Sequence, residues 1–324
     1  MLTSCSLTLV ARAFGTVPVT LVTFDVDGTL IQGSSAQAEV SQHARAFSYG
    51  VGSVFAPPGS LDDFQAKYPA PLAAIDPKWY HGSTDGLIAL QFARQACGVP
   101  PHDAVLRLNE VFRRMFEYCV RVPDTVMMQG IEPLPGIIAQ LQHLRDHPLF
   151  AEHVLCGLVT GNVEGIARKK MRSCGIWATG VLSRSALEQQ QWPGEDVAAF
   201  LGGFGSDYCS GNLADESRIY KDRGEQIAIA FRRAQSLLLP GQRIVRVVHV
   251  GDAPGDVLAA KYCSDENKFG DGVAVGCVAV ATGKFSQTTL ERLFGETQVG
   301  RWEPVCLLKG IADPSFIDVL KIQR

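Results

Sequence analysis

Two aspartates, Asp25 and Asp27, follow the apolar stretch VPVTLVTF and stand directly before Gly28. The stretch is dense in β-branched residues, which predicts a buried strand. Carboxylates at the end of a buried strand cost free energy unless a partner compensates their charge. Because side chains two residues apart on extended backbone share one face, the two carboxylates can act together. The pattern therefore predicts a metal ion or a reaction at this strand end.

Polar residues also follow two later predicted strands. The strand in HVLCGLVTGN ends in Thr160, Gly161 and Asn162, and the strand in RIVRVVHVGD leads into Asp252 and Asp256 of GDAPGD. In open α/β sheets, ligands bind beyond the carboxyl ends of the strands. We therefore expect these residues to converge with the first aspartate pair, although the chain separates them widely.

A carboxylate cluster of this kind suits phosphoryl chemistry. Clustered carboxylates raise each other's pKa unless a cation joins them. Oxygen ligands without a nearby His or Cys favour Mg²⁺, which also binds phosphate oxygens. One carboxylate can act as nucleophile, while a neighbour protonates the leaving oxygen and then deprotonates water. Thr160, Gly161 and Asn162 are the candidates for binding the substrate's phosphoryl group.

The rest of the sequence predicts the elements that position these residues. From Leu134 onward, strand-like runs alternate with helical patterns, which indicates a doubly wound parallel sheet of the α/β class. The region before it is mostly helical with proline-rich loops, and Thr84 and Gly98 are predicted to cap one of its helices. We predict a core of residues 17–32 and 131–324, a helical cap inserted at residues 33–130, and an N-terminal extension at residues 1–16.

The polar motifs, in this order, resemble those of the haloacid dehalogenase-like hydrolase superfamily. Its first motif, D-x-D-G-T, stands as DVDGT, its second as VTGN, and its fourth, G-D-x-x-x-D, as GDAPGD. The segments HGSTDGLIALQFARQACG, PLPGIIAQL and VAVATGKFS are similar to the phosphoglycolate phosphatase-like branch. The resemblance implies a Rossmann-like core and a helical cap of the C1 type.

The resemblance also implies a role for each matching residue. Asp25 would be the nucleophile, and Asp27 the general acid and base. Asp25, the main-chain carbonyl of Asp27, and Asp252 would bind Mg²⁺. Asp256 would bind the metal through water or orient a nearby cation, and Thr160 would bind the phosphoryl group.

The third motif of the superfamily is a Lys or Arg near the start of a helix that precedes the fourth motif. The candidates in this chain are Arg218, Lys221 and Arg223. The segment DRGEQIAIAFRRA is most similar to the Arg-led helix of the branch, so Arg223 ranks first and Lys221 second.

The function that these residues predict is a Mg²⁺-dependent phosphatase that hydrolyses a small phosphomonoester through an aspartyl-phosphate. Phosphoglycolate is the substrate that the branch resemblance suggests. A dehalogenase is disfavoured by Asp27, because an ester formed from carbon requires no protonated leaving oxygen. A sugar-phosphate mutase and a non-catalytic binding protein on the same fold remain alternatives.

Composition narrows the class of protein further. The chain has 324 residues, of which 46% are hydrophobic and 19% charged, with a formal net charge of −3. This balance supports a sizeable core and argues against nucleic acid as the main partner. No apolar run is long enough for a membrane helix. Nine scattered cysteines without a C-x-x-C pair suit reduced thiols, so we expect a cytoplasmic protein. A short organellar presequence at residues 1–16 is an alternative. We also expect the protein to be a monomer or a homodimer.

A basic segment and a buried histidine of the sequence are expected to have no catalytic role. The segment RKKMR, residues 168–172, is predicted to be the solvated face of a helix, where its charges favour the C-terminal half. His249 lies within the apolar VVHVGD strand and is predicted to be a packed sheet residue.

Overall fold

The computed structural model describes residues 16–33, 41–76, 82–184, 200–296 and 301–323. Within them, six strands form one parallel sheet in the order β5-β4-β1-β6-β7-β8. The first strand of the chain therefore lies between β4 and β6, which confirms the predicted doubly wound parallel sheet. The strands are β1 (Val17–Phe24), β4 (Val154–Thr160), β5 (Gly202–Phe204), β6 (Gln242–Gly251), β7 (Ala274–Val280) and β8 (Trp302–Leu307).

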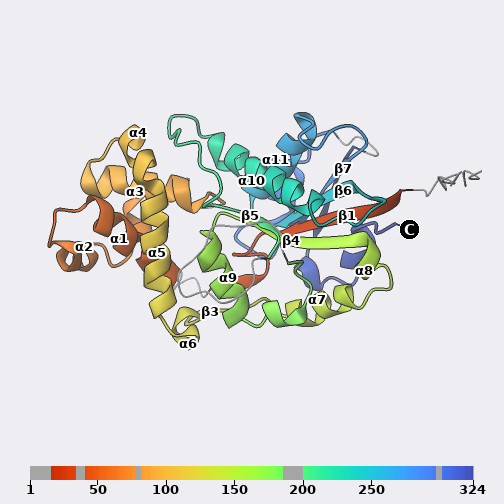
Figure 1. Ribbon diagram of the computed structural model, residues 1–324, viewed down its shortest axis with the longest axis horizontal. Coiled ribbons are helices and arrows are strands. Elements are labelled where there is room, and N and C mark those ends of the chain that lie inside the picture. The colour runs from red at the N-terminus through yellow and green to blue at the C-terminus, as the bar shows by residue number, and fades with distance from the viewer. Residues whose placement is uncertain (1–15, 34–40, 77–81, 185–199, 297–300, 324) are drawn as a thin grey trace, which may run out of the picture.

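Helices cover both faces of this sheet (Figure 1). One face packs against α10 (Arg218–Gln235), α11 (Pro254–Asp265) and α12 (Gln287–Glu291). The other packs against α7 (Ile137–Arg145), α8 (Phe150–His153), α9 (Glu164–Ser173) and α13 (Phe316–Val319). Two short 3₁₀ helices, η5 (Trp177–Thr179) and η6 (Gly310–Ala312), complete this second layer.

The alternation of β1 side chains explains why its sequence is apolar throughout. Val22 and Phe24 contribute to the core on the α7 and α13 side. Val19 and Leu21 contribute to the core on the α10 and α11 side. A strand that is buried on both faces has hydrophobic residues at successive positions, without alternation.

The chain between β1 and α7 forms a helical unit with its own core (Figure 1). Its core includes Phe47, Phe92, Met115 and Phe116. Two short antiparallel strands, β2 (Ile31–Gly33) and β3 (Ile131–Pro133), lie at the entry and exit of this unit. The fold is therefore an α/β core with an inserted helical cap. The cap elements are α1 (Gln42–Phe55), α2 (Leu61–Lys67), η2 (Pro71–Ala74), α3 (Asp85–Cys97), α4 (Pro101–Ala104), η4 (Val105–Arg107), α5 (Leu108–Arg121) and α6 (Asp124–Met127).

Both predicted caps of α3 are present. The Thr84 side chain accepts a hydrogen bond from the Leu87 N–H, and Gly98 ends the helix in the left-handed conformation at φ +69°. These local signals fix where α3 begins, next to the core.

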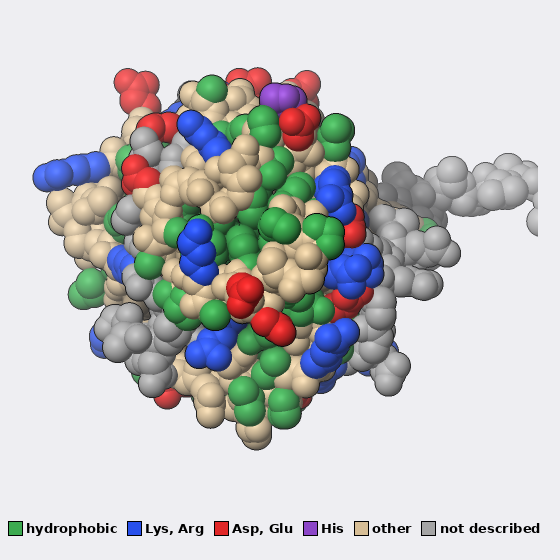
Figure 2. Space-filling model, turned by 90° about the vertical axis from the view of Figure 1, so that its left-hand side faces the viewer, with side chains coloured by type: hydrophobic (Ala, Val, Ile, Leu, Met, Phe, Trp, Pro, Cys, Tyr) green, Lys and Arg blue, Asp and Glu red, His purple; other side chains and the backbone are tan. Residues whose placement is uncertain are grey.

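The carboxyl ends of the parallel strands point toward the cap (Figure 1). The outer face of the cap intersperses basic, acidic and hydrophobic side chains, as Figure 2 shows. Within the described residues, no helix has both the length and the apolarity of a membrane span. Apart from residue 16, the N-terminal extension predicted at residues 1–16 lies outside the described residues.

Candidate active site

The first two aspartates occupy the turn that follows β1. The Asp25 N–H donates to the Val250 carbonyl at 2.8 Å, so the backbone of Asp25 continues the ladder with β6. Gly28 has φ +93°, a conformation that favours glycine, and its N–H donates to the Ile31 carbonyl. The chain therefore turns away directly after the two carboxylates.

Three carboxylates meet at the ends of β1 and β6. One oxygen each from Asp25, Asp252 and Asp256 lies within 4.8 Å of the others, and all three residues are buried. Two glycines enclose Asp252, because a Cβ atom at Gly28 or Gly283 would overlap its carboxyl group. The predicted convergence of the first and fourth motifs is thus present.

Arg223 on α10 contacts two members of this cluster. Its Nη1 lies 2.9 Å from Asp25 Oδ1 and also donates to Asp256. Its Nη2 donates to the Ser83 carbonyl at 3.3 Å, just before α3 of the cap. The third-motif cation predicted first therefore lies at the acidic cluster and also contacts the cap.

Asp256 orients that cation. Its Oδ1 contacts Arg223 and lies 3.2 Å from His249 Nε2, and its Oδ2 accepts from the Ala253 N–H at 3.0 Å. The other ring nitrogen of His249 is 3.0 Å from the Thr23 hydroxyl. Because both carboxylate oxygens are engaged, Asp25 and Asp252 are better placed than Asp256 to ligate a metal directly. His249 is a buried residue behind the cluster, as expected.

The charges of the cluster shift its pKa values in opposite directions. Burial, with the neighbouring Asp256 and Asp27, raises the pKa of Asp25 to about 7 against the opposing charge of Arg223. Burial and the charges of Asp25 and Asp256 raise the pKa of Asp252 well above its usual range. Burial also opposes ionisation of Asp256, but Arg223 and His249 outweigh it and lower its pKa to about 2.

The cluster fits a divalent metal ion. It presents three buried carboxylates to one guanidinium, so excess negative charge remains, as the raised pKa values of Asp25 and Asp252 reflect. Buried like charges of this kind are stabilised by a cation. All donors are oxygens, which favours Mg²⁺ over softer metals.

Asp27 lies apart from the three buried carboxylates. Its side chain is 49% exposed, and both of its oxygens lie 2.8 Å from Lys170 Nζ on α9. The Asn162 amide donates to Asp27 Oδ2 at 2.9 Å. Desolvation raises the pKa of Asp27, but the charge and hydrogen bond of Lys170 and the hydrogen bond of Asn162 outweigh it, so the pKa is lowered. Its side chain is thus an ionised carboxylate facing solvent beside the cluster.

The second motif joins the site at the end of β4. The buried Thr160 hydroxyl accepts from the Asn162 N–H at 3.3 Å, which leaves its hydrogen available to a ligand. The Gly161 carbonyl accepts from the Asp85 N–H at 2.7 Å, so the cap contacts this turn. The Asn162 side chain is engaged with Asp27 and Lys170 rather than presented to a substrate.

The other two candidates for the third-motif cation lie away from the carboxylates. Arg218 Nη2 is 2.7 Å from Asp222 Oδ1 and 3.2 Å from the Tyr208 hydroxyl. Lys221 lies on the half-exposed side of α10, where its charge acts on Asp215. The prediction of Lys221 as a catalytic cation is therefore not supported, because Lys221 precedes Arg223 by two positions, which turns its side chain about 200° around the helix axis.

The prediction of a solvated face for residues 168–172 is wrong. Arg168, Lys169 and Lys170 are 6%, 3% and 1% exposed. Lys169 pairs with Asp124 on α6 at 3.0 Å, while Lys170 reaches Asp27. The basic run therefore faces the cap and the site.

Sequence reasoning missed three residues of the site: Lys170, His43 and Asp85. Helical spacing gave no signal for Lys170, because the residues of α9 from Glu164 to Met171 are all buried and the helix has no single buried face. His43 and Asp85 are single polar residues of the cap, and only the tertiary fold brings them to Lys170.

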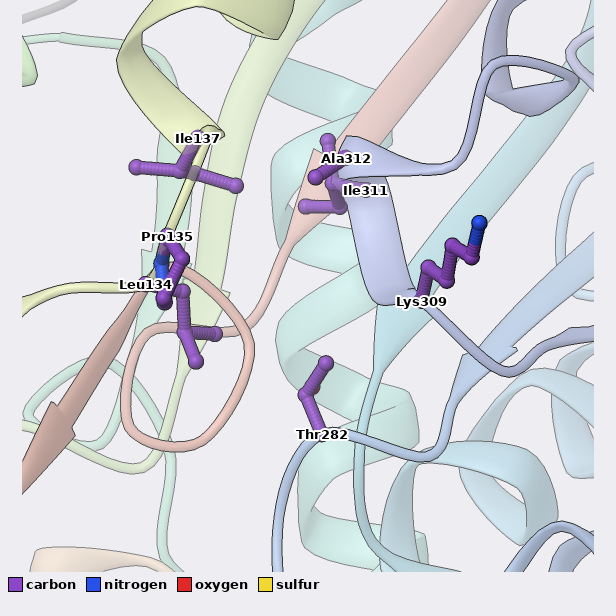
Figure 3. A pocket seen from close by; sticks show the side chains of 7 residues that line it. All are labelled: Leu134, Pro135, Ile137, Thr282, Lys309, Ile311 and Ala312. Atoms are coloured by element: carbon purple, nitrogen blue, oxygen red, sulfur yellow. The ribbon is translucent and has the colours of Figure 1, made fainter.

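A small apolar pocket lies beside the turn that carries the first two aspartates (Figure 3). It measures about 210 Å³, and Thr282 in its wall donates to the Gly28 carbonyl at 2.7 Å. Its apolar lining contrasts with the carboxylates on the other side of the turn. The lining residues are Leu134, Pro135, Ile137, Thr282, Lys309, Ile311 and Ala312.

Comparisons with known proteins give structural neighbours only. No protein-family model and no curated protein sequence matches the chain. The structure of L-2-haloacid dehalogenase from Xanthobacter autotrophicus with chloropropionic acid covalently bound is similar, with a TM-score of 0.36 and 12% identity over 94% of this chain and 98% of that one. A second structure of that dehalogenase has a TM-score of 0.37 at the same identity and coverage.

A third similar structure is the archaeal β-phosphoglucomutase from Pyrococcus sp. strain ST 04. Its TM-score is 0.31, with 13% identity over 86% of this chain and 99% of that chain. All three TM-scores lie below 0.5. The sheet order, the cap inserted after the first strand and the aspartates at the ends of β1 and β6 agree with the arrangement that the sequence motifs predict.

Proposed function

We propose that this protein is a Mg²⁺-dependent phosphatase that hydrolyses a small phosphomonoester through an aspartyl-phosphate on Asp25. The observation that carries the proposal is the pair of carboxylates in the first motif. Asp25 is buried in the carboxylate cluster, whereas Asp27 is 49% exposed and Lys170 lowers its pKa. A buried nucleophile beside an accessible acid–base is the arrangement that ester cleavage followed by hydrolysis needs.

In the first step, an Asp25 oxygen attacks phosphorus, the bond to the ester oxygen breaks, and that oxygen takes a proton from Asp27. A dianionic phosphate bound near Asp27 would raise the pKa of that carboxyl group and favour the proton it must donate. In the second step, Asp27 removes a proton from water, the water oxygen attacks phosphorus, and the bond to Asp25 breaks.

The remaining residues bind and neutralise charge. Arg223, held by Asp256, lies 2.9 Å from Asp25, and the Thr160 hydroxyl can donate to a phosphoryl oxygen. Mg²⁺, held by Asp25, Asp252 and, as the resemblance implies, the main-chain carbonyl of Asp27, would offset the negative charge of the transferring group.

The test is phosphate release from a panel of phosphomonoesters that includes phosphoglycolate, with and without Mg²⁺. We expect Mg²⁺-dependent release by the wild-type protein and a loss of at least about 10³-fold in Asp25→Asn, because the amide cannot act as the nucleophile. Isomerisation of a sugar phosphate faster than phosphate release would favour a mutase instead. Absence of both reactions would favour a binding protein.

A further inference from the structure

A chain of buried polar groups connects the cap to Asp27. Lys170 Nζ lies 2.8 Å from both oxygens of Asp27, 2.7 Å from Asn162 Oδ1 and 3.1 Å from His43 Nδ1. Its side chain is 1% exposed. A buried ammonium is costly unless its three hydrogens find acceptors, and here they find them on the core and on the cap together.

The cap holds the far end of this chain in place. His43 on α1 has its Nε2 2.9 Å from Asp85 Oδ2, and the same Asp85 oxygen accepts from the Val163 N–H at 2.8 Å. With Lys170 donating to Nδ1, the partners assign the neutral His43 tautomer that carries its proton on Nε2 and donates to Asp85. Each group in this series therefore has a hydrogen-bond partner in the next one.

We infer that Lys170 is a positioning residue that aligns Asp27 for proton transfer, and that His43 is the cap residue that fixes Lys170. This inference rests on the proposed phosphatase function. Without the ring nitrogen of His43, the four-carbon stem of Lys170 loses one of the contacts that define its position. Asp27 is then aligned best while the cap is seated on the core, which links enclosure of the substrate to the position of the acid–base group.

The neighbouring Lys169 supplies a matched control. It is also buried on α9 and also pairs with an aspartate of the cap, Asp124 on α6, but neither residue contacts Asp27 in the described structure. Lys169→Met and Lys170→Met each remove one buried ammonium and keep an unbranched apolar side chain. A merely structural role for Lys170 predicts the same behaviour in both variants.

The dependence on the leaving group separates the two roles. With p-nitrophenyl phosphate, the leaving phenolate needs no proton, so loss of acid–base alignment impairs only the hydrolysis of the aspartyl-phosphate. We expect Lys170→Met to release the first equivalent of nitrophenolate within a few fold of the wild-type rate and then turn over about 10²-fold more slowly. With the alkyl phosphomonoester that ranks first in the panel, the first turnover should itself slow by about 10²-fold.

His43→Phe provides a second variant that leaves Lys170 in place. The substituted ring can keep the stacking contact with Phe47, whose centroid lies 5.5 Å from that of His43. We expect the same burst and the same preference for the good leaving group, with a smaller loss of about 3- to 10-fold, since Lys170 still contacts Asp27.

The outcomes separate failure of this inference from failure of the proposed function. If the wild type is an Asp25-dependent phosphatase but Lys170→Met and Lys169→Met reduce the turnover rate equally with both leaving groups, the inference about Lys170 is wrong and the proposed function stands. The inference is also overturned if Lys170→Met fails to fold and a folded His43→Phe shows no burst. If the wild type releases no phosphate from any ester, both fall together.

Discussion

The guanidinium of Arg223 lies 2.9 Å from the carboxylate of Asp25, although the two residues come from the long helix α10 and from the turn after β1. Arg223 is 3% exposed and also pairs with Asp256. It is therefore the cation that balances part of the charge on the nucleophile.

Replacement of Arg223 should impair turnover far more than replacement of Lys221. We expect Arg223→Ala to reduce kcat by about 10²- to 10³-fold, because a buried charge aimed at the reacting group is lost. Lys221→Ala should stay within about 2-fold of the wild type, since surface charge substitutions have small effects. Steady-state phosphate release on folded variants would measure both. Equal reductions of kcat in the two variants would show that Arg223 is not the cation that acts on Asp25.

Two aspartates of the cluster should respond to neutralisation with opposite signs. Without metal, Asp252→Asn should raise the melting temperature, because the pKa of Asp252 is raised by burial and by the nearby Asp25 and Asp256. Asp256→Asn should destabilise the protein by about 3 kcal/mol, because the buried Arg223 then loses one of its two carboxylate partners.

Thermal unfolding in EDTA would show both effects, and addition of Mg²⁺ should stabilise Asp252→Asn less than the wild type. A lower melting temperature for Asp252→Asn in EDTA would mean that the cluster carries no excess negative charge.

Magnesium binding should depend on pH. The pKa of Asp25 is raised to about 7 in the metal-free protein, so Asp25 is protonated below that pH and must lose its proton to bind metal. The apparent affinity for Mg²⁺ should therefore rise between about pH 6 and pH 8, with net proton release. Calorimetry in two buffers of different ionisation enthalpy would detect the released proton.

The same shift has a consequence for stability. Because the pKa of Asp25 is higher in the folded state than its ordinary value of 3.8, its contribution to metal-free stability is full below that value and is lost as the pH rises through about 7. Mg²⁺ should raise the melting temperature more at about pH 8 than at about pH 5.5. An equal increase at both pH values would contradict the assignment of Asp25 as a ligand.

Gly28 should be required for a reason beyond its backbone conformation. Gly28 and Gly59 both have positive φ, +93° and +80°, so alanine strains each by about 1 kcal/mol. Of these two glycines, Gly28 is the one whose added Cβ would overlap the Asp252 carboxyl group, because no described atom lies within 4 Å of such a Cβ at Gly59.

We therefore expect Gly28→Ala to weaken Mg²⁺ binding by at least about 10-fold and Gly59→Ala to leave it unchanged. Mg²⁺ titration of the two variants would compare them directly. Equal affinities would show that Gly28 serves the turn alone.

The sequence was sufficient for the residues that end strands. Asp25 and Asp252 each follow a recognisable apolar strand and Thr160 ends one, and parallel strands bring their carboxyl ends to one edge of a sheet. The helical cap was also predictable, since its helices have strong periodicity and one carries both of its capping residues. The order of the strands and the pairing of α9 with the cap depend on tertiary packing.

The sequence was insufficient where a side chain's direction decided its role. Arg218, Lys221 and Arg223 fall within two turns of one helix, and only the packing of α10 shows that Arg223 reaches the carboxylates. Lys170 looked like a surface lysine because its neighbours are also basic. The cap covers that face of α9, and a local pattern cannot reveal what covers it.

The most direct test of the account is to locate the phosphoryl group on the protein. Asp27→Asn, incubated with p-nitrophenyl phosphate and Mg²⁺, should accumulate the intermediate, because the good leaving group needs no acid and the asparagine cannot activate water. Mass spectrometry after proteolysis should find one phosphoryl group on the peptide that contains Asp25, and none when Asp25→Asn is added. Release of nitrophenolate with the phosphoryl group on another residue, or with no labelled peptide, would contradict nucleophilic catalysis by Asp25.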